Sequence, residues 1–511
     1  MADQERARFI AMHPKSQALA QQAMQHWLFG VPLHWMSDWS TPFALQVASA
    51  QGAHLTDADG HSYVDFCLGD TGAMFGHAPP AVVQAVQRQV AKGCTTLLSG
   101  DDAAWVGAEL ARRFGLPLWQ SALSASDANR FLLRWVRAAT GRKKLLVFNG
   151  CYHGTVDDVF VDLIDGKPRQ RDSLLGQVHG LTEHTVVVEF NDLPALEAAL
   201  QTGDVACVLA EPVMTNIGMV LPQPGFWEAA QTLIRQHGAL LVLDETHTFS
   251  SGPGGYARAH GLQPDALVLG KPIAGGLPCA VYGFSAELAE RAMQAKRSAP
   301  PGHSGIGTTL SGNLLAMAAM RATLAEVATD ANFAHMIARS CEVADGLRAS
   351  ITRHQLPWCV TQVGARCEFQ FGPLPPVNGS QAEALFDPAL ESLLHLALLN
   401  RGVLITPFHN MLLCSPATTQ ADVQRLLTAF DEVLALWVAV GVDTCEPPKL
   451  GTVPQKDLEP LGCHPGPDPG SSPLGCDPGP DPGSSDTGSH GLRVEPAMTS
   501  GLKAGAGKGD T

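Results

Sequence analysis

Short apolar runs alternate with amphipathic segments between about residues 105 and 310. Runs such as 239–243 (ALLVL) and 266–269 (ALVL) are too short for helices. Polar residues or glycines punctuate them, so each is predicted to be a buried strand. The segments between them carry apolar residues at helical spacing, as in 128–139. Alternating strands and helices are typical of βαβ units, so the pattern predicts an α/β fold with a mainly parallel sheet.

The flanking regions follow other patterns. Residues 1–30 carry apolar positions at helical spacing, interrupted at Pro14, which predicts one or two surface helices. The Asp/Gly-containing segment 57–60 has the composition of a tight reversal and predicts a hairpin. Residues 331–445 mix amphipathic helices with strands such as CEFQF and GVLITP, which fits a smaller α+β domain.

These patterns divide the chain into four regions. We expect an arm and hairpin at 1–65 that belong to a small domain, a large domain at 66–315, the rest of the small domain at 316–447, and a tail at 448–511. The tail contains a near-repeat, PLGCHPGPDPGSS followed by PLGCDPGPDPGSS. Such a composition buries too little apolar surface to offset chain entropy, so the tail is predicted to be disordered.

Composition excludes several classes of function. The 511 residues have a net charge of −15 and no basic run, which argues against nucleic-acid binding. The twelve cysteines form no CxxC pair or metal-binding spacing and so predict free thiols in a reducing, cytoplasmic setting without a metal site. No segment approaches the length of a membrane span or of the apolar core of a signal peptide.

Four of the apolar runs end in polar or aromatic residues. LLVFN leads to Tyr152 and His153, CVLA to Glu211, LLVLD to Asp244, and ALVLG to Lys271. The carboxyl ends of parallel strands share one edge of a sheet, and ligands bind there in open α/β folds. Because buried charge is costly unless it is paired or used, these residues predict a functional site.

A carboxylate and an amine at such an edge are the two protein groups that pyridoxal phosphate requires. A lysine forms a Schiff base with it, and an aspartate keeps the pyridinium nitrogen protonated. The helix predicted after Ser124 begins with serines and offers free N–H groups to a phosphate. In the alternative interpretation Asp244 caps a helix, Lys271 is a solvated loop charge, and Ser124 is an ordinary cap. The convergence of the strand ends favours the cofactor site.

Over roughly residues 40–445 the chain resembles the class III aminotransferases of pyridoxal-phosphate fold type I, and most of all the glutamate-1-semialdehyde aminomutase branch. Five motifs fall in the order of that family: TGRKKLLVFNGCYHG, AEPVMTNIG, LLVLDET, GKPIAGGLP and TTLSGN. The resemblance implies a large domain with a mostly parallel seven-stranded sheet, a smaller α+β domain, and a homodimer with shared active sites.

The resemblance also implies roles for individual residues. Lys271 forms the internal aldimine and moves a proton between the substrate carbon and the cofactor. Asp244 pairs with the pyridinium nitrogen, and Tyr152 stacks on one face of the ring. The other implied cofactor-binding positions are Ala125 and Ser126 in the phosphate turn, Glu211 and Asn216 lining the pocket, Thr246 and His247 near the ring, His153, and Thr309, which reaches the phosphate from the other subunit.

The chain departs from the family pattern at three of these positions. Ala125 stands where the phosphate turn usually has glycine, and Thr246 replaces a valine that packs under the ring. His247 stands where the family often has Gln or Met near the ring oxygen. His247 is therefore either a partner of that oxygen or a packed core histidine.

The usual substrate-binding arginines have no counterpart in the matching segments. His34 and Trp35 stand near the place of an early arginine, and the segment FHNMLLCSPATT after GVLITP also lacks one. An arginine fork is the preferred partner of a carboxylate. We therefore expect a ping-pong aminotransferase that moves an amino group from an amino acid or amine to an oxo acid. The alternatives are an aminomutase on the same scaffold and a non-catalytic scaffold. Trp35, Trp39 and Phe75 either line an apolar substrate pocket or belong to the core.

Overall fold

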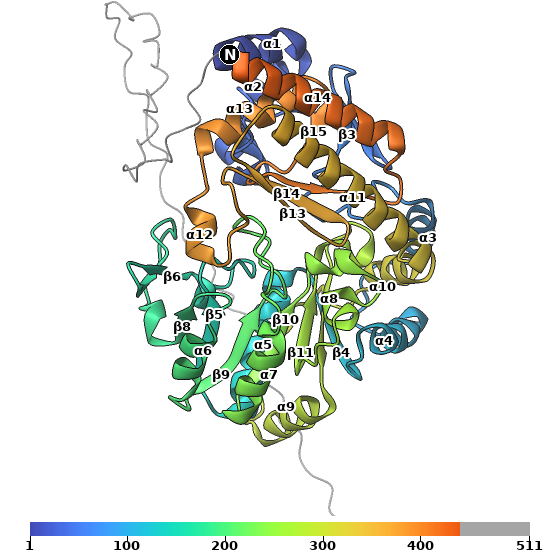
Figure 1. Cartoon of the computed structure of the whole chain (residues 1–511). Coiled ribbons are helices and arrows are strands. Elements are labelled where there is room, and N and C mark those ends of the chain that lie inside the picture. Colours follow the sequence, from blue (N-terminus) through green and yellow to red (C-terminus); the bar gives the residue numbers. More distant parts are fainter. Residues whose placement is uncertain (440–511) are drawn as a thin grey trace, which may run out of the picture. The chain divides into compact units, whose positions relative to one another are not determined.

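The computed structural model describes residues 1–439 (Figure 1). The predicted tail at 448–511 and the end of the predicted small domain lie outside the described residues. A seven-stranded sheet forms the centre of the larger part, with strand order β4-β12-β11-β10-β9-β5-β8. Its strands are β4 (Leu118–Ala122), β12 (Ala280–Phe284), β11 (Ala266–Leu269), β10 (Leu240–Asp244), β9 (Val205–Ala210), β5 (Lys144–Phe148) and β8 (Thr185–Val188). Only β12 runs antiparallel to its neighbours, which confirms the predicted mostly parallel sheet.

Both faces of the inner strands β9, β10, β11 and β12 are buried, which explains why these strands are apolar almost throughout. In β10, Leu241 and Leu243 belong to one core cluster, and Leu240 and Val242 belong to another. Successive side chains of a strand point to opposite faces, so helices cover both sides. Helix α7 (Phe226–Gln236) packs on the first face and α5 (Ala125–Thr140) on the second. The other helices of this part are α3 (Pro80–Val90), α4 (Asp101–Phe114), α6 (Leu193–Leu200), α8 (Gly255–Ala259), α9 (Ala286–Ser298) and α10 (Leu314–Ala322).

The smaller α+β part is built around two further sheets. The antiparallel sheet β13-β14-β16 contains Cys359–Val363, Arg366–Gln370 and Met411–Leu413. It packs with α11 (Asp330–Arg353), α13 (Pro388–Leu399) and α14 (Gln420–Ala439), as Figure 1 shows. The second sheet, β1-β2-β3-β15, contains Val47–Gln51, His54–Asp57, Ser62–Asp65 and Val403–Leu404. Strand β15 lies parallel to β3, so segments near both ends of the described chain share one sheet.

The N-terminal predictions are confirmed. The apolar pattern of residues 1–30 corresponds to two helices, α1 (Ala2–Met12) and α2 (Pro14–Ala23). Pro14 is the first residue of α2, where its missing N–H costs no hydrogen bond. Strands β2 and β3 form the predicted hairpin. Two small elements complete the described strands and α-helices: the hairpin of β6 (Val161–Ile164) and β7 (Lys167–Gln170), and α12 (Gly379–Glu383).

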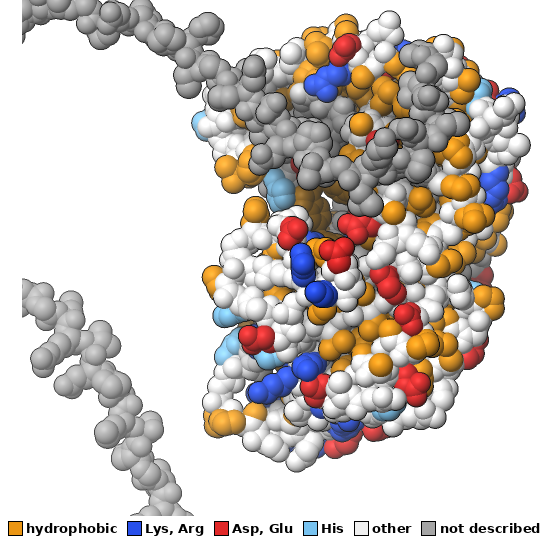
Figure 2. Space-filling model, turned by 60° about the vertical axis from the view of Figure 1, so that its left-hand side comes forward, with side chains coloured by type: hydrophobic (Ala, Val, Ile, Leu, Met, Phe, Trp, Pro, Cys, Tyr) orange, Lys and Arg blue, Asp and Glu red, His pale blue; other side chains and the backbone are white. Residues whose placement is uncertain are grey.

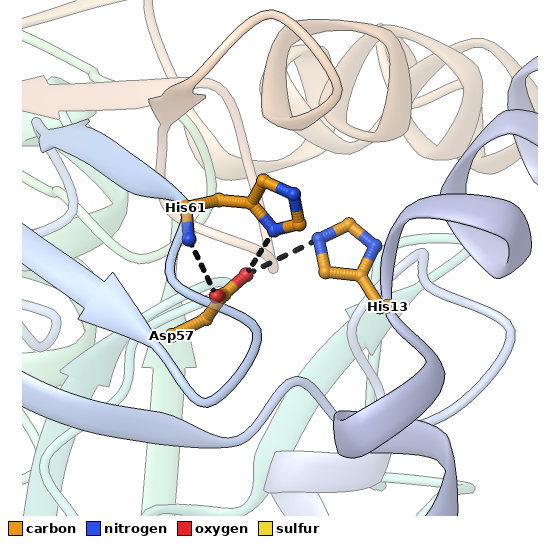
Figure 3. A group of neighbouring side chains, drawn as sticks. All are labelled: His13, Asp57 and His61. Carbon is orange, nitrogen blue, oxygen red and sulfur yellow. Dashed lines mark hydrogen bonds and ion pairs between the residues drawn. The ribbon is translucent and has the colours of Figure 1, made fainter.

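A buried cluster fixes the N-terminal helices to this hairpin (Figure 3). Asp57 Oδ2 accepts a hydrogen bond from the Tyr63 hydroxyl at 2.7 Å, and it lies 3.0 Å from His61 Nδ1 and 3.2 Å from His13 Nε2. His13 Nδ1 in turn donates to the carbonyl oxygen of Phe9 in α1 at 2.7 Å. These side chains satisfy one another by hydrogen bonding, so a structural role explains why residues of metal-ligating type meet here.

The substitution Asp57→Ala is expected to lower the free energy of unfolding by about 3 kcal/mol, because it leaves buried polar groups without a partner. Urea unfolding followed by circular dichroism measures this change. Asp172→Ala, at an exposed carboxylate, is the matched control and should change stability little. A loss no larger than that of the control would show that the cluster does not hold the helices.

The stabilisation that Asp57 contributes decreases as the pH falls. Burial alone would raise the pKa of Asp57, but hydrogen bonds from Tyr63 and His61 outweigh it, and the pKa lies below its usual value. The contribution is therefore complete above the unfolded-state pKa, about 3.9, and is lost as the pH falls through the lower folded-state value.

Figure 2 shows Lys and Arg side chains interspersed with Asp and Glu over the face in view. Among residues 1–439, none of the helices combines the length and the apolar character that crossing a membrane requires.

Candidate active site

A cavity of about 410 Å³ opens at the carboxyl ends of β5, β9, β10 and β11. Most of the residues predicted from the sequence meet here, because four parallel strands end at the same edge. The predicted residues that line it are Ala125, Ser126, Tyr152, Glu211, Asn216, Asp244, Thr246, His247 and Lys271. Two predicted residues, His153 and Thr309, are not among the lining residues.

Asp244 is a fixed, ionised carboxylate on the wall of the cavity. Its Oδ2 accepts a hydrogen bond from Asn129 Nδ2 at 2.9 Å and lies 3.2 Å from His153 Nδ1, while Oδ1 accepts from the Thr246 N–H at 3.1 Å. Burial alone would raise the pKa of Asp244, but the hydrogen bond with His153 and the other donors lower it. His153 is buried behind Asp244, and the carboxylate raises the pKa of His153 to about 10 against the effect of burial. His153 therefore positions the Asp244 carboxylate through this contact and does not itself line the cavity.

Lys271 follows β11 and points into the cavity from a backbone position with φ of 42°. This left-handed conformation costs energy for a residue with a side chain, so it marks a position held by its surroundings. Lys271 Nζ lies 2.7 Å from Asp70 Oδ2 and 2.5 Å from His247 Nε2. Burial would raise the pKa of Asp70, but the charge of Lys271 lowers it, so the lysine faces an ionised carboxylate.

The start of helix α5 forms one end of the cavity. The Ser124 hydroxyl caps the helix by accepting a hydrogen bond from the Asp127 N–H at 3.2 Å. Ser126 Oγ accepts from the Thr155 N–H at 2.9 Å. A Cβ atom at Gly154 would collide with Ser126, and one at Gly270 would collide with Ala125, so both glycines permit a close backbone approach. The turn can bind an anion through the helix N-terminus.

The departures from the family pattern are compatible with this geometry. Ala125 lies within the right-handed helix α5, so a glycine is not required at this position. Thr246 is buried, and its hydroxyl has no hydrogen-bond partner among the described residues. His247 lines the cavity with Nε2 directed at Lys271, so it is more than a packed core histidine. Thr309 is exposed in the segment between α9 and α10.

The three aromatic candidates separate in the structure. Trp35 lines the cavity, with its ring centroid 6.4 Å from that of Tyr152. Phe75 is buried in the core against Phe249, and Trp39 packs against the cluster that contains Phe9. Only Trp35 is therefore a candidate for contact with a substrate.

Sequence reasoning missed four residues of the site: Asp70, Asn129, Thr215 and Arg366. Asp70 follows strand β3 in the Gly-rich segment LGDTG, and its position after a strand was the available signal. Arg366 comes from β14 and is fully buried. It donates from Nη2 to the carbonyl oxygen of His247 at 2.9 Å, and burial lowers its pKa to about 10. Among the residues that line the cavity, Lys271 is the one Lys or Arg side chain.

Comparison with known proteins agrees with this geometry. The model of the family "Aminotransferase class-III" matches residues 35–434. A glutamate-1-semialdehyde 2,1-aminomutase of Chloroflexus aggregans is 36% identical over 400 residues, which cover 75% of this chain and 89% of that protein.

Three solved structures extend the comparison. The crystal structure of a glutamate-1-semialdehyde-aminomutase from Pseudomonas aeruginosa PAO1 is 50% identical, with a TM-score of 0.83, and covers 85% of this chain and 97% of that one. A K286A form of a glutamate-1-semialdehyde-aminomutase from the same organism was crystallised in complex with PMP. An omega-transaminase from Sphaerobacter thermophilus is 25% identical with a TM-score of 0.76, covering 83% of this chain and 99% of that one. The family match, together with the cavity that holds Lys271 and Asp244, shows that this chain belongs to the class-III aminotransferases, a family of pyridoxal-phosphate-dependent enzymes.

Proposed function

We propose that this protein is a pyridoxal-phosphate-dependent aminomutase of the glutamate-1-semialdehyde type. Such an enzyme moves an amino group between neighbouring carbons of one substrate and needs no external oxo acid. The observation that carries the proposal is the 50% identity, over 85% of this chain, to the Pseudomonas aeruginosa aminomutase. The sequence alone led us to expect an aminotransferase with a separate oxo acid, and the comparisons support the aminomutase better.

The residues of the cavity fit the cofactor. Asp244 presents an ionised carboxylate, Ser126 stands at the start of a helix where glycines permit close approach, and the unpartnered Thr246 hydroxyl offers a polar contact. When bound, pyridoxal phosphate supplies an electron sink that stabilises negative charge on the substrate carbon. Asp244 would hold the ring nitrogen, and the first turn of α5 would hold the phosphate.

The remaining chemistry falls to Lys271. Its amine can accept a proton from one substrate carbon and return it to a neighbouring atom, because it projects into the cavity on a fixed backbone. Asp70 holds the amine in place through their ion pair. Tyr152 and Trp35 also line the cavity, with their rings in contact, and their apolar surfaces would face a bound substrate.

We also propose that the protein acts as a homodimer in which the partner's Thr309 completes the phosphate site. The exposure of Thr309 on its own subunit, away from its own cavity, supports this arrangement.

A second candidate function is transamination between an amine and an oxo acid. It is favoured by the cavity, in which the described residues supply no arginine to bind the carboxylate of a semialdehyde. In this case the amino donor is a small amine or an unusual amino acid, and the acceptor is an oxo acid.

The two candidates separate in one assay. The full chain, loaded with pyridoxal phosphate, is incubated with glutamate-1-semialdehyde in the absence of any oxo acid. We expect the substrate to convert to the isomer whose amino group lies on the neighbouring carbon, measured by mass spectrometry after derivatisation. Turnover of amines only when an oxo acid is added would favour transamination. Absence of both reactions in a protein that binds the cofactor would refute both proposals.

A further inference from the structure

A continuous line of hydrogen bonds connects Lys271 to Glu211 along the wall of the cavity. Lys271 Nζ lies 2.5 Å from His247 Nε2, and His247 Nδ1 lies 2.7 Å from Thr215 Oγ1. The Thr215 hydroxyl then contacts Glu211 Oε2 at short range. The other carboxylate oxygen, Oε1, accepts a hydrogen bond from Asn216 Nδ2 at 3.1 Å. The four members come from the ends of three neighbouring strands, β9, β10 and β11.

The inner part of this line is shielded from solvent. Thr215 is fully buried, and His247 and Glu211 are 4% and 5% exposed, whereas the Lys271 side chain is 28% exposed. A proton that passes from Lys271 to His247 can therefore travel along the hydrogen bonds without entering bulk water.

The protons along this line of hydrogen bonds can be arranged in two ways. In the first, Lys271 donates to His247 Nε2, His247 Nδ1–H donates to the Thr215 hydroxyl, and the hydroxyl donates to an ionised Glu211. In the second, a protonated Glu211 donates to Thr215, Thr215 donates to His247 Nδ1, and His247 Nε2–H points at a neutral Lys271. Each arrangement satisfies every member, because a hydroxyl and a neutral imidazole both donate once and accept once.

We propose that Glu211 stores the proton that Lys271 must lose before it can act as a base. Converting the first arrangement into the second breaks one N–H bond of Lys271 and forms the Nε2–H bond of His247. It also breaks the Nδ1–H bond and forms a new O–H bond on Thr215, whose original proton passes to Glu211. One proton thus moves from the amine to the carboxylate, and the net charge of the four residues does not change.

The surrounding charges are consistent with a reversible transfer. Burial raises the pKa of Glu211, which makes it able to take up a proton. Burial and the charge of Lys271 keep the pKa of His247 well below its usual value, so the ring is neutral between transfers. Of the other charged groups around the line, Asp70 favours the charged amine, and Arg366 lies behind His247. Three further groups act on it: His409 from the segment between β15 and β16, His153 from the segment after β5, and Asp244 from the end of β10.

This inference rests on the proposed function, in which Lys271 acts as a base, but its test does not require turnover. In the full chain freed of cofactor, Lys271 is labelled with acetic anhydride from pH 6 to 9, and the extent is measured by mass spectrometry. Acetylation needs the neutral amine. Internal transfer to Glu211 supplies a neutral fraction that does not depend on pH, so the wild-type rate should level off toward acid pH. In Glu211→Gln, which retains the shape but cannot take up a proton, the rate should fall about tenfold per pH unit.

Two variants at Thr215 test the path in the loaded enzyme. Thr215→Val removes the hydroxyl and should lower kcat about 100-fold with little change in KM, as expected for loss of proton transfer. Thr215→Ser restores the hydroxyl and should recover most of kcat. Thr248→Val is the matched control, because Thr248 is also buried and donates to a buried carboxylate, Glu245, outside the line. It should leave both the labelling profile and kcat close to those of the wild type.

The proposal is overturned if the wild-type labelling rate falls tenfold per pH unit throughout, or if Glu211→Gln retains the levelled profile. It is also overturned if Thr215→Val and Thr248→Val have equal effects. If the protein catalyses no amino-group transfer, the proposed function fails, and the labelling profile still decides whether Glu211 takes up the proton.

Discussion

Lys271→Ala is expected to lower kcat by about 10⁴-fold, the upper range for removal of a group that transfers protons in a transition state. The loss follows because Lys271 is the one lysine among the described residues that line the cavity, and its amine is the group that would form the Schiff base to the cofactor and carry the proton. Stability should change little, since the Lys271 side chain is partly exposed and its removal takes away no core packing. Progress curves at saturating substrate and thermal unfolding measure the two effects.

Lys144→Ala is the matched control for this variant. Lys144 starts β5 and forms a surface ion pair with Asp204 at 2.8 Å, far from the strand ends that carry the site. Its removal should leave kcat unchanged. A second measurement is borohydride reduction of the loaded wild type, which should fix the cofactor's mass on Lys271. Full activity of Lys271→Ala would instead support a non-catalytic scaffold.

Asp244→Asn should lower kcat by about 10³-fold. The carboxylate is ionised at working pH because its pKa is lowered, and its negative charge is what would keep a ring nitrogen protonated. An amide has the same shape but no charge, so the electron sink weakens while the hydrogen bond from Asn129 can persist. Activity and cofactor affinity, measured by titration of the visible absorbance, should both decrease.

Glu245→Gln is the matched control for Asp244→Asn. Glu245 is the next residue and also fully buried, but its carboxylate is occupied by Thr248 and by the N–H groups of Tyr256 and Ala257. This substitution should lower stability and leave cofactor affinity unchanged. Equal losses of affinity in the two variants would contradict the role assigned to Asp244.

The strand-end residues of the site were predictable because the signal is local. The polar residues follow the end of each apolar run within five positions. The parallel arrangement of the strands then brings Tyr152, Glu211, Asp244 and Lys271 together. The same reasoning gave the helix start at Ser124, where the cap is formed as expected.

The remaining parts of the site depend on contacts that no local pattern encodes. Asp70 is 201 positions from Lys271, and Arg366 reaches His247 across 119 positions and a different sheet. The hydrogen bond between His153 and Asp244 depends on the orientation of the His153 ring, which the sequence motif does not specify. Thr309 is a contact between subunits by hypothesis, so it cannot be placed by the geometry of a single chain.

The pairing of β15 with β3 has a consequence for biosynthesis. Strand β3 emerges early during translation, whereas Val403–Leu404 is synthesised only after the whole large sheet. The N-terminal hairpin therefore waits for its last strand until nearly all of the described chain has left the ribosome. During that interval one edge of β3 lacks its partner, and an unpaired edge is where chains associate wrongly. Nascent-chain folding of the N-terminal segment is thus coupled to completion of the protein.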